Sequence, residues 1–501
     1  MNLDPRTPVI VGVGQISQPE LPAPEPVALI AEAARLAGDD AAAPSLLGSL
    51  DSIRIVNLLS RAYPDPAALV AGLLGATPRE TVATTAGGNT PQVLLNRTAE
   101  DIMAGRLDVA LIGGAESWRT RSWYKARGEK APWSQQDAAT TPTVTVGEEL
   151  VLAAAEELAL GLGAPVQFYP MFETALMVSA AAAGTKPDDH LSGAAALWAR
   201  FSAVAATNPY AALPAALTAS QIATPTPDNR YIGWPYTKRM NSNNNVDQAA
   251  VVMMCSVEAA VAAGVPRDRW VFLHAGSRAS DQVDVIRRDR LDASPAIRAV
   301  GRDTLALAGI GVDDLELVDL YSCFPSAVQV AARELGLDLQ RDLTVTGGLT
   351  FAGGPWNNYV THGIATMVER LRARPDAYGL CTANGGNLTK HAAGVYAAFP
   401  PATPPRFGHP QEQVDATPRR AVAPRGWQGS GRLEAWTVMH DRAGQPEVAF
   451  AYGLTGDGAR LVGASRDSDL LAALAGGTAM SSLSSVGPPV AVWDGDGGFA
   501  L

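Results

Sequence analysis

The sequence predicts an α/β protein in which a duplicated strand–helix unit carries a large insertion and is followed by a small all-β domain. Apolar runs alternate with amphipathic helical segments before residue 118 and again after residue 245, which is typical of layered α/β proteins. Between these parts, over 118–245, the alternation is lost. Beyond a proline-rich segment at 401–427, residues 428–501 show short alternating strands with glycine and aspartate turns, as expected of a barrel or sandwich.

The first unit opens with a strand and a helix. Residues 8–15 (PVIVGVGQ) are rich in β-branched residues, which indicates a buried strand. Residues 25–38 place apolar residues at helical spacing and end at Gly38, a residue type that commonly closes helices. The same reasoning predicts a strand at 51–59, a helix at 66–76, a helix at 92–106 and a strand at 108–117.

The second unit repeats this alternation. The elements expected in it are a strand at 270–277, a helix at 294–309, a strand at 315–324 and a helix at 326–336, whereas a strand and a helix within 246–264 resume the first unit after the insertion. Seven prolines between Pro400 and Pro424 indicate a semi-rigid linker. Four strands are expected after it, in GRLEAWTVMH, EVAFAYGL, ARLVGAS and PVAVWD.

The composition argues against several classes of protein. The 501 residues are 47% hydrophobic and 18% charged, with a formal net charge of −11, an ordinary balance for a chain with large cores. Nucleic-acid and membrane-surface proteins usually present a basic face, so we expect neither partner. No apolar run is long enough to span a membrane and no leader pattern is visible, so we expect neither a transmembrane helix nor a signal peptide.

The cysteines and short motifs point away from disulfides and metals. Cys255, Cys323 and Cys381 lie in or near apolar segments and cannot form a disulfide framework. A reducing cytoplasm is the simplest location. The sequence contains no CxxC, HExxH or GxxxxGK pattern, so we expect no metal site and no phosphate-binding loop.

The two units share a repeated motif. Ala-Gly-Gly at 86–88 is followed by a helix and the strand DVALIGGAES, and Ala-Gly-Gly at 352–354 is followed by a helix and DAYGLCTANGG. The second glycine of each pair precedes the aspartate of the strand by 20 and 22 residues, respectively. We therefore predict a duplicated fold whose two equivalent helix N-termini face one pocket. Coincidence in a chain with 48 glycines is the alternative.

Five segments carry a resemblance to a known family. They are AEDIMAGRLDVALIGGAES, VDQAAVVMMCSVEAA, ELVDLYSCFPSA, GGLTFAGGP and CTANGGNLTKHAAGVYA. Over roughly residues 6–400 the chain resembles the thiolase superfamily, on its sterol-carrier-protein-type branch. The additional C-terminal domain makes it most similar to the thiolase-like proteins of type 1, which are commonly labelled acetyl-CoA acetyltransferases.

The resemblance implies a five-layered fold of two similar halves with a loop domain inserted in the first. The resulting division of the chain is an N-terminal half at 1–117 and 246–268, a loop domain at 118–245, a C-terminal half at 269–400, a linker at 401–427 and an additional β domain at 428–501. It also implies coenzyme A or an acyl-CoA as substrate or ligand, no covalently bound cofactor, a place in lipid metabolism, and either a homodimer or a monomer.

The sequence departs from the family at its catalytic positions. The family's nucleophilic cysteine, at the N-terminus of a helix in the first half, corresponds to Gly88, and no cysteine precedes Cys255. The histidine of the family's Gly-His-Pro motif corresponds to Gly354. The Asn or His of a third family motif corresponds to Tyr321. A Gly-His-Pro does occur at 408–410, but within the proline-rich segment.

Several polar residues and glycines remain as candidates for a site. Backbone N–H groups of Gly87 and Gly88 suit a thioester oxygen or an anion, although a tight packing turn explains the pair equally well. His391, Cys381 and Tyr321 are candidate catalytic residues; the alternatives are a solvated loop for His391 and a buried strand cysteine for Cys381. Further candidates for contact with the substrate or its oxyanion are Asn89, Gly354, Asn384 and Lys390. Asn89 could instead cap the helix.

The insertion carries aromatic and basic residues that suit an adenine ring and phosphates. In the family this loop domain binds coenzyme A. The residues expected to do so are Arg119, Arg121, Trp123, Arg230, Trp234, Lys238 and Arg239. A solvated basic loop is the alternative.

Three functions remain open from the sequence. The first is an acetyl-CoA acetyltransferase-like enzyme that transfers an acyl group or forms or cleaves a C–C bond next to a thioester; loss of the nucleophile makes a covalent route hard to support. The second is a retro-aldol acyl-CoA lyase, in which a base such as His391 or Tyr321 removes a proton while backbone N–H groups hold the thioester oxygen. The third is a non-catalytic protein that binds CoA or acyl-CoA.

Overall fold

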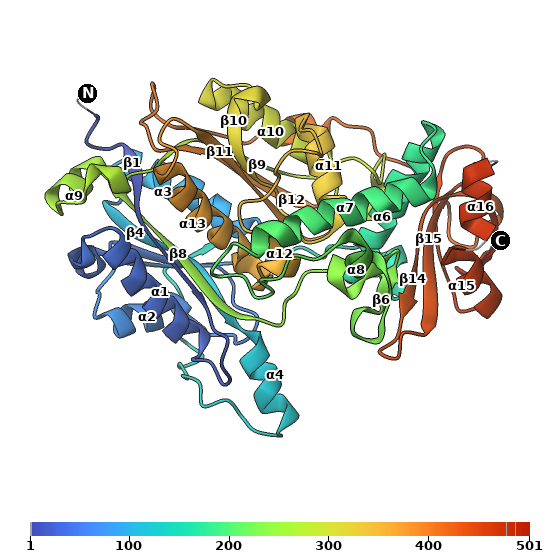
Figure 1. Ribbon diagram of the computed structural model, residues 1–501, viewed down its shortest axis with the longest axis horizontal. Helices are drawn as coiled ribbons and strands as arrows, with labels where there is room; N and C mark the ends of the chain where they lie inside the picture. Colours follow the sequence, from blue (N-terminus) through green and yellow to red (C-terminus); the bar gives the residue numbers. More distant parts are fainter. Residues whose placement is uncertain (1–2, 477, 486) are drawn as a thin grey trace.

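A computed structural model describes residues 3–476, 478–485 and 487–501 and contains three sheets (Figure 1). The first has six strands in the order β1 (Pro8–Ser17), β8 (Asp247–Ser256), β4 (Val109–Ser117), β2 (Ser52–Ile55), β3 (Glu80–Thr84) and β5 (Val144–Val146). The second has five, in the order β10 (Leu315–Asp319), β11 (Tyr378–Gly385), β12 (Lys390–Ala397), β9 (Phe272–Ser280) and β13 (Arg406–Gly408).

The two sheets confirm the predicted duplication. Four strands of the first sheet, in the order β2-β4-β8-β1, pair in parallel, antiparallel and antiparallel fashion. Four strands of the second, in the order β10-β11-β12-β9, pair in the same sequence of directions. The segment that would correspond to β3 contains no strand, since residues 336–347 run as turns and irregular chain into α12 (Gly348–Phe351).

Helices complete five layers. The outer layers are α1 (Pro26–Asp40) with α2 (Pro66–Leu74) on the first sheet, and α10 (Pro295–Ala308) with α11 (Pro325–Leu335) on the second. Between the sheets lie α3 (Thr90–Met103) and α13 (Tyr359–Arg372), which contact each other and strands of both sheets. Both central helices are almost entirely buried, as expected where a helix packs on two sheets.

Local sequence explains where the outer helices begin and end. Asp65 caps α2 by accepting from the N–H of Ala68, and Ser294 caps α10 by accepting from the N–H of Ile297. Each helix starts with a proline and ends at a glycine in the left-handed conformation. The central helix α3 starts at Thr90, two residues before the predicted start.

The insertion contributes helices and short strands that link the halves to the C-terminal sheet. Its helices are α4 (Trp118–Ala126), α5 (Ala155–Ala159), α6 (Pro165–Ala182), α7 (Pro187–Ala205) and α8 (Ala219–Ala223). Helix α4 projects from the body at the bottom of Figure 1. Strand β5 covers the edge of β3, and β6 (Tyr231–Trp234) pairs with β7 (Tyr236–Thr237) and with the C-terminal strand β14.

The C-terminal part forms the third sheet, drawn in red in Figure 1. Its strands are β14 (Gln428–His440), β15 (Pro446–Leu454), β16 (Arg460–Ser465), β17 (Val490–Asp494) and β18 (Phe499–Ala500). It also carries α15 (Ser468–Leu474) and α16 (Thr478–Ser485), which the alternating pattern did not predict. No helix within the described ranges is both long and apolar enough to cross a membrane.

The proline-rich segment 401–427 is more structured than a linker. Residues 406–408 form β13 along the edge of β9, and residues 411–415 form α14 (Gln411–Asp415), which packs against α10 and β9. The prediction of a semi-rigid linker is therefore wrong for this part. Strand β13 pairs with β9, which lies some 130 residues earlier in the chain. Local composition does not reveal such a distant pairing.

Arg460 joins the C-terminal sheet to the second half. Its side chain is fully buried and donates to both carboxylate oxygens of Glu434, at 2.8 and 2.7 Å. It also donates to the carbonyl oxygens of Ile286, Arg288 and Asp289 in the segment after β9. A buried guanidinium that satisfies a carboxylate and three carbonyls at once fixes the position of one domain on the other.

We expect Arg460→Met to lower the free energy of unfolding by about 3–5 kcal/mol, because Glu434 and three carbonyls lose their donor. Arg466→Met is the matched control, since Arg466 pairs with Glu447 at the surface, 3.5 Å away, and should cost less than about 1 kcal/mol. Urea unfolding of both variants measures the difference. Equal losses would contradict a connecting role for Arg460.

Candidate functional site at the start of helix α3

The first turn of α3 meets the first turn of α13, as the repeat predicted. The N–H of Gly87 donates to Oδ1 of Asn357, 2.9 Å away, just before α13. Asn357 in turn donates to the carbonyl of Asn57, 2.8 Å away. The N–H of Gly87 is therefore already bonded within the protein, and the expected role of that group in holding an anion is not available to it.

Tyr321 occupies the space in front of Gly88. A Cβ added at Gly88 would lie 2.5 Å from the backbone oxygen of Asn384 and 2.9 Å from Cζ of Tyr321, and closer still to the Tyr321 hydroxyl. Real Cβ atoms do not tolerate such contacts. Position 88 therefore accepts glycine alone without rearrangement, and the side chain of a nucleophile at that position has no room.

Two backbone donors remain free at this helix start. Within the described residues, the N–H groups of Gly88 and Asn89 have no acceptor, whereas the N–H of Thr90 donates to the Gly87 carbonyl at 3.1 Å. Oδ1 of Asn89 is buried and also lacks a partner, so Asn89 does not use its side chain as a helix cap. Free N–H groups at a helix N-terminus attract a negatively charged or polarised oxygen.

Tyr321 is well placed and remains protonated. Its backbone N–H donates to Oγ1 of Thr382 at 2.9 Å, and its ring packs edge-on against Tyr359 at the start of α13, with ring centroids 5.6 Å apart. Burial raises the pKa of Tyr321 well above its ordinary value. The hydroxyl is therefore a neutral hydrogen-bond donor at physiological pH, and it lies next to the free N–H of Gly88.

Lys390 approaches the same helix start from β12. Its Nζ donates to the carbonyl oxygen of Ala86 at 2.8 Å. Burial lowers its pKa, while the carboxylates of Glu149 and Glu148 act in the opposite direction. The structure thus brings together Gly88, Asn89, Tyr321 and Lys390 from the predicted set.

His391 lies on the opposite face of β12, which corrects the expectation that it serves this helix. Alternate residues of a strand point to opposite faces, and the face of Lys390 is also that of Tyr396, which donates to Gln92 of α3. His391 points toward α10, where its Nε2 lies 3.5 Å from Oδ2 of Asp281. Its ring therefore faces the outer layer and cannot act as acid or base at Gly88.

Cys381 is a core residue. It is 1% exposed and belongs to the main apolar cluster, which spans both halves. Burial raises the pKa of its thiol well above the ordinary value, so it stays protonated and unreactive. The predicted catalytic role of Cys381 is not supported, and its alternative as a buried strand cysteine fits the structure.

Asn384 shapes the turn that faces Gly88. Its Nδ2 donates to the hydroxyl of Tyr169 at 2.8 Å, and that hydroxyl also bonds Gly386 and Leu388. Oδ1 of Asn384 is buried without a partner. The insertion residue Tyr169 on α6 therefore fixes the chain that carries the Asn384 carbonyl against Gly88.

Gly354 is also next to a side chain that sequence reasoning missed. A Cβ at Gly354 would lie 3.0 Å from Oδ1 of Asn244 and 3.4 Å from the carbonyl of Leu349. The Gly354 N–H donates to the Asn243 carbonyl at 2.9 Å. The polar run MNSNNN at 240–245 was visible in the sequence, but nothing local indicated that it would pack on the second Gly-Gly pair.

Glu116 is a second residue that the sequence analysis missed. It binds the chain segment that follows Asn57. Its two carboxylate oxygens accept from the backbone N–H groups of Leu59 and Ser60, at 2.8 and 2.6 Å. These residues follow Asn57, the partner of Asn357. Burial raises the pKa of Glu116 to about 7. The strand pattern ending in GAES predicted a buried strand but gave no sign of this role.

The seven residues expected to bind coenzyme A fall into two groups. Trp234 is buried and stacks on Trp436 of the C-terminal sheet, with centroids 6.2 Å apart, so its expected contact with a ligand is wrong. The guanidinium of Arg119 donates to the carbonyls of Gln18 and Glu20. Those of Arg230 and Arg239 likewise donate to backbone carbonyls, of Tyr231 and Gln221.

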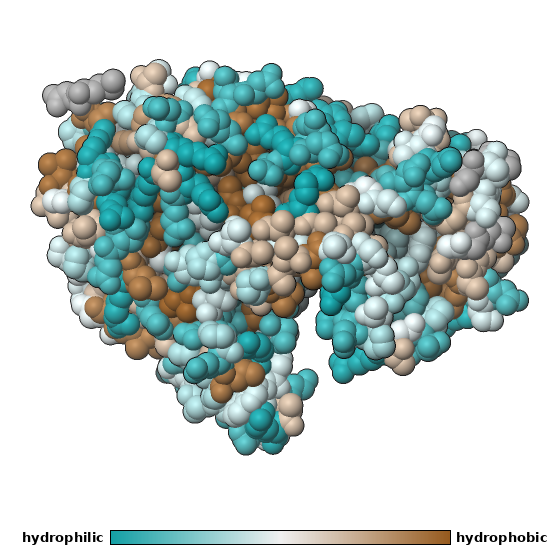
Figure 2. Space-filling model, in the orientation of Figure 1, coloured by the Kyte–Doolittle hydropathy of each residue, from teal (hydrophilic) through white to brown (hydrophobic). Residues whose placement is uncertain are grey.

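Arg121, Trp123 and Lys238 keep surface positions. Arg121 is exposed and lies over the ring of Trp118, 4.7 Å from its centroid. Trp123 is half-buried under Arg127 at 3.6 Å. Lys238 is exposed at the end of β7. Figure 2 shows the surface hollowed between the part that contains α4 and the part that contains β6 and α8, with hydrophilic residues on both sides.

No three His, Cys, Asp or Glu side chains in the described part of the chain are grouped so that they could hold a metal ion.

Comparison with known proteins identifies the family. The solved structure of a monomeric SCP2-thiolase-like protein type 1 from Mycobacterium smegmatis is similar over 100% of both chains, with 30% sequence identity and a TM-score of 0.81. The chain belongs to this family of thiolase-like proteins. In addition, residues 410–497 match the family described as the thiolase-like protein type 1 additional C-terminal domain.

More distant relatives show how the family fold is shared. The dimeric peroxisomal thiolase of Saccharomyces cerevisiae is similar over 79% of this chain and 98% of its own, with 16% identity and a TM-score of 0.57. An Ltp2-ChsH2(DUF35) aldolase structure covers 78% of this chain and 98% of its own, with 18% identity and a TM-score of 0.58. A curated 3-ketoacyl-CoA thiolase of Bacillus subtilis is 28% identical over 158 residues, which span 31% of this chain and 37% of the relative.

We expect Gly88→Ala to lower the free energy of unfolding by about 1–3 kcal/mol, because the new methyl group overlaps Tyr321 and the Asn384 carbonyl. Gly72→Ala is the matched control, since nothing lies within 4 Å of a Cβ there and alanine is the better helix former in α2. Thermal or urea unfolding compares the two. A Gly88→Ala protein as stable as the wild type would contradict the steric account.

Glu116 gives a pH-dependent prediction. The folded state holds its proton up to about pH 7, whereas the unfolded chain loses it near the ordinary pKa of 4.5. Since the folded state binds more protons in this range, the free energy of unfolding falls as pH rises from about 4.5 to about 7. The contribution is on the order of 3 kcal/mol.

Urea unfolding at pH 5 and pH 8 tests this linkage. The Glu116→Gln variant should lose most of the decrease between the two pH values, whereas Glu412→Gln, at an exposed position in α14, should keep it. The same pH dependence in Glu116→Gln and wild type would show that Glu116 is not the titrating group.

Proposed function

We propose that this protein binds acyl-CoA thioesters at the start of α3 and acts on them without a covalent acyl-enzyme. The observation that carries the proposal is the position of Tyr321. Its hydroxyl lies where a nucleophilic side chain at Gly88 would project, beside two free backbone N–H groups. These three donors suit a thioester oxygen that gains negative charge during a reaction.

The chemistry follows from the groups that remain. With Gly88 in place of a nucleophile, acyl transfer through an enzyme thioester is not available. Polarisation of the thioester by Gly88 N–H, Asn89 N–H and Tyr321 makes the neighbouring carbon more acidic and stabilises an enolate. Lys390, whose pKa burial lowers, is the group in this cluster that can exchange a proton. Proton transfer or retro-aldol cleavage next to the thioester is the matching reaction class.

Coenzyme A would dock in the hollow between α4 and β6. Arg121 and Lys238, at the surface of these two parts of the insertion, offer exposed cationic groups for phosphates, and Trp123 offers an aromatic ring. The printed names of relatives support an acyl-CoA ligand, since one is a 3-ketoacyl-CoA thiolase. The aldolase name of another accords with C–C bond cleavage. We further propose that the protein acts as a monomer, as the name of the similar Mycobacterium smegmatis structure states for that protein, and that it works in cytoplasmic lipid metabolism.

Binding without turnover is the second candidate, and one observation favours it. Both positions that would carry the catalytic pair are glycines, and each faces a side chain from elsewhere, Tyr321 at Gly88 and Asn244 at Gly354. With other side chains in the space of both catalytic side chains, the site could still bind the ligand without catalysing a reaction.

The test is turnover measured by mass spectrometry. The purified full chain is incubated with a panel of 3-ketoacyl-CoA and 3-hydroxyacyl-CoA esters, with and without free CoA. We expect shortened acyl-CoA with a released ketone or aldehyde from the 3-hydroxyacyl-CoA esters, and a loss of at least about 100-fold in rate for Tyr321→Phe, because removal of one oxyanion donor typically costs this much.

Tyr378→Phe serves as the control, because Tyr378 lies at the opposite end of β11 from the site. Full activity in Tyr321→Phe, or a covalent acyl-enzyme adduct, would contradict the non-covalent route. Binding of acyl-CoA with no product across the panel would favour the second candidate.

A further inference from the structure

The outer layer of the second half contains a basic groove that lies over an apolar cavity. The groove has a volume of about 530 Å³ and runs along α10 and α11. Four arginines line it, Arg290, Arg298, Arg302 and Arg333. In a chain with a net charge of −11, four arginines around one groove form a local centre of positive charge that attracts anions.

Only part of this charge is neutralised within the protein. Arg298 pairs with Glu334 at 2.7 Å, and Arg290 and Arg333 share Asp292 at 2.6 and 3.2 Å. Four arginines against two carboxylates leave a net charge of +2. Arg302 is exposed and makes no hydrogen bond or ion pair within the described residues, so one guanidinium in the groove is free for an anion.

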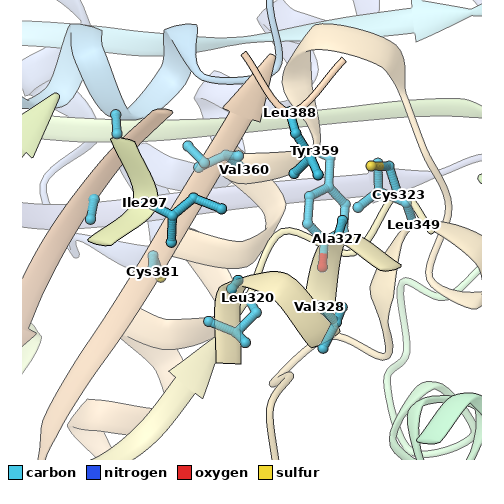
Figure 3. Packing of buried hydrophobic residues seen from close by; sticks show 14 of the residues in the cluster. Ile297, Leu320, Cys323, Ala327, Val328, Leu349, Tyr359, Val360, Cys381 and Leu388 are labelled. Carbon is cyan, nitrogen blue, oxygen red and sulfur yellow. The ribbon is translucent and has the colours of Figure 1, made fainter. Parts of the chain in front are cut away.

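Beneath the groove, a cavity runs between the two helices and the second sheet. Its walls are mostly apolar and include Ile297, Val300, Ala327, Ala331 and Leu380. Figure 3 shows Ile297 of α10 and Ala327 of α11 in this buried region, with Leu388 and Cys381 nearby. In the present structure the cavity has about 20 Å³ of space, enough for about one water molecule. An alkyl chain would enter it only as the apolar side chains between α10 and α11 move apart.

Gly301 and Leu335 separate the groove from the cavity, since both residues line both spaces. A Cβ at Gly301 would overlap Cδ2 of Leu335, so the leucine side chain rests directly on the glycine. Leu335 is the last residue of α11 and is half-buried. Rotation of this side chain would open the cavity toward the groove.

We infer that this groove and cavity form a binding site for an amphiphilic anion, with its charged head among the arginines and its alkyl chain between α10 and α11. The charge of the groove selects the head, and the apolar walls select the chain. The lining of the cavity also includes polar residues, Asn384 and His391, and Oδ1 of Asn384 is buried without a hydrogen-bond partner. A chain that reaches them gains no further apolar contact, so the site has a limit on chain length.

The site is separate from the proposed thioester site, because it opens on the other side of the second sheet and requires no coenzyme A. The inner ends approach each other at Tyr321, which also lines the cavity. A bound chain would therefore press on the ring that covers Gly88, which offers a route for one site to influence the other.

Isothermal titration of the full chain with alkyl anions tests the inference. Dodecanoate and dodecyl phosphate should bind, and the comparison shows which anionic head is preferred. Dodecanol and dodecyltrimethylammonium should bind at least tenfold more weakly, because they lack the negative charge. Over a series of fatty acids, affinity should rise about two- to fourfold per methylene and then level off.

The variants separate the groove from general surface charge. Arg302→Glu should weaken dodecanoate binding at least tenfold. Arg374→Glu should leave it unchanged, because Arg374 is exposed after α13 and its side chain makes no hydrogen bond or ion pair among the described residues. Leu335→Ala should speed association by removing the side chain that closes the cavity. Lys390→Met, which changes the thioester cluster but lines neither the groove nor the cavity, should keep the binding, which distinguishes this site from the thioester site.

Two results would overturn the inference. One is absence of dodecanoate and dodecyl phosphate binding to the wild-type protein at millimolar concentration. The other is binding that Arg302→Glu and Arg374→Glu weaken equally, which would indicate non-specific attraction to the surface.

Discussion

The close approach of the two halves at Gly87 and Gly88 governs the structure of the site. The start of α3 contacts the segment before α13 through Gly87 and Asn357, and the turn between β11 and β12 presses the Asn384 carbonyl against Gly88. Any side chain at position 88 would push these segments apart. Glycine at this position is therefore a packing requirement of the duplicated fold as it stands here, and the loss of the nucleophile is built into that packing.

What remains after this loss is a coherent set of donors. Gly88 and Asn89 keep free N–H groups, and burial keeps the Tyr321 hydroxyl protonated. Lys390 holds the Ala86 carbonyl from the second half. If this site no longer bound a ligand, its buried polar atoms would be expected to form hydrogen bonds within the protein. Here the unpaired groups lie together at one helix start, which is the property expected of a site that binds an oxygen-bearing ligand.

The sequence was sufficient for features that depend on local pattern. The order of strands and helices in the two halves and the duplication around the two Gly-Gly pairs follow from residue spacing, and the candidates Gly88 and Tyr321 follow from the family resemblance. It failed where the answer depended on register or on distant partners. Lys390 and His391 are neighbours in sequence, and only the register of β12 decides which one faces α3. The local sequence around Trp234 suggests a surface aromatic residue. It is buried because β6 pairs with β14, some two hundred residues later in the chain.

The most direct test of the account is a crystal structure of the protein with a non-hydrolysable acyl-CoA analogue. The account predicts that the oxygen replacing the thioester carbonyl lies within hydrogen-bond distance of the Gly88 and Asn89 N–H groups and of the Tyr321 hydroxyl. A complex with the acyl end bound elsewhere, or with Tyr321 turned away from the ligand, would contradict it.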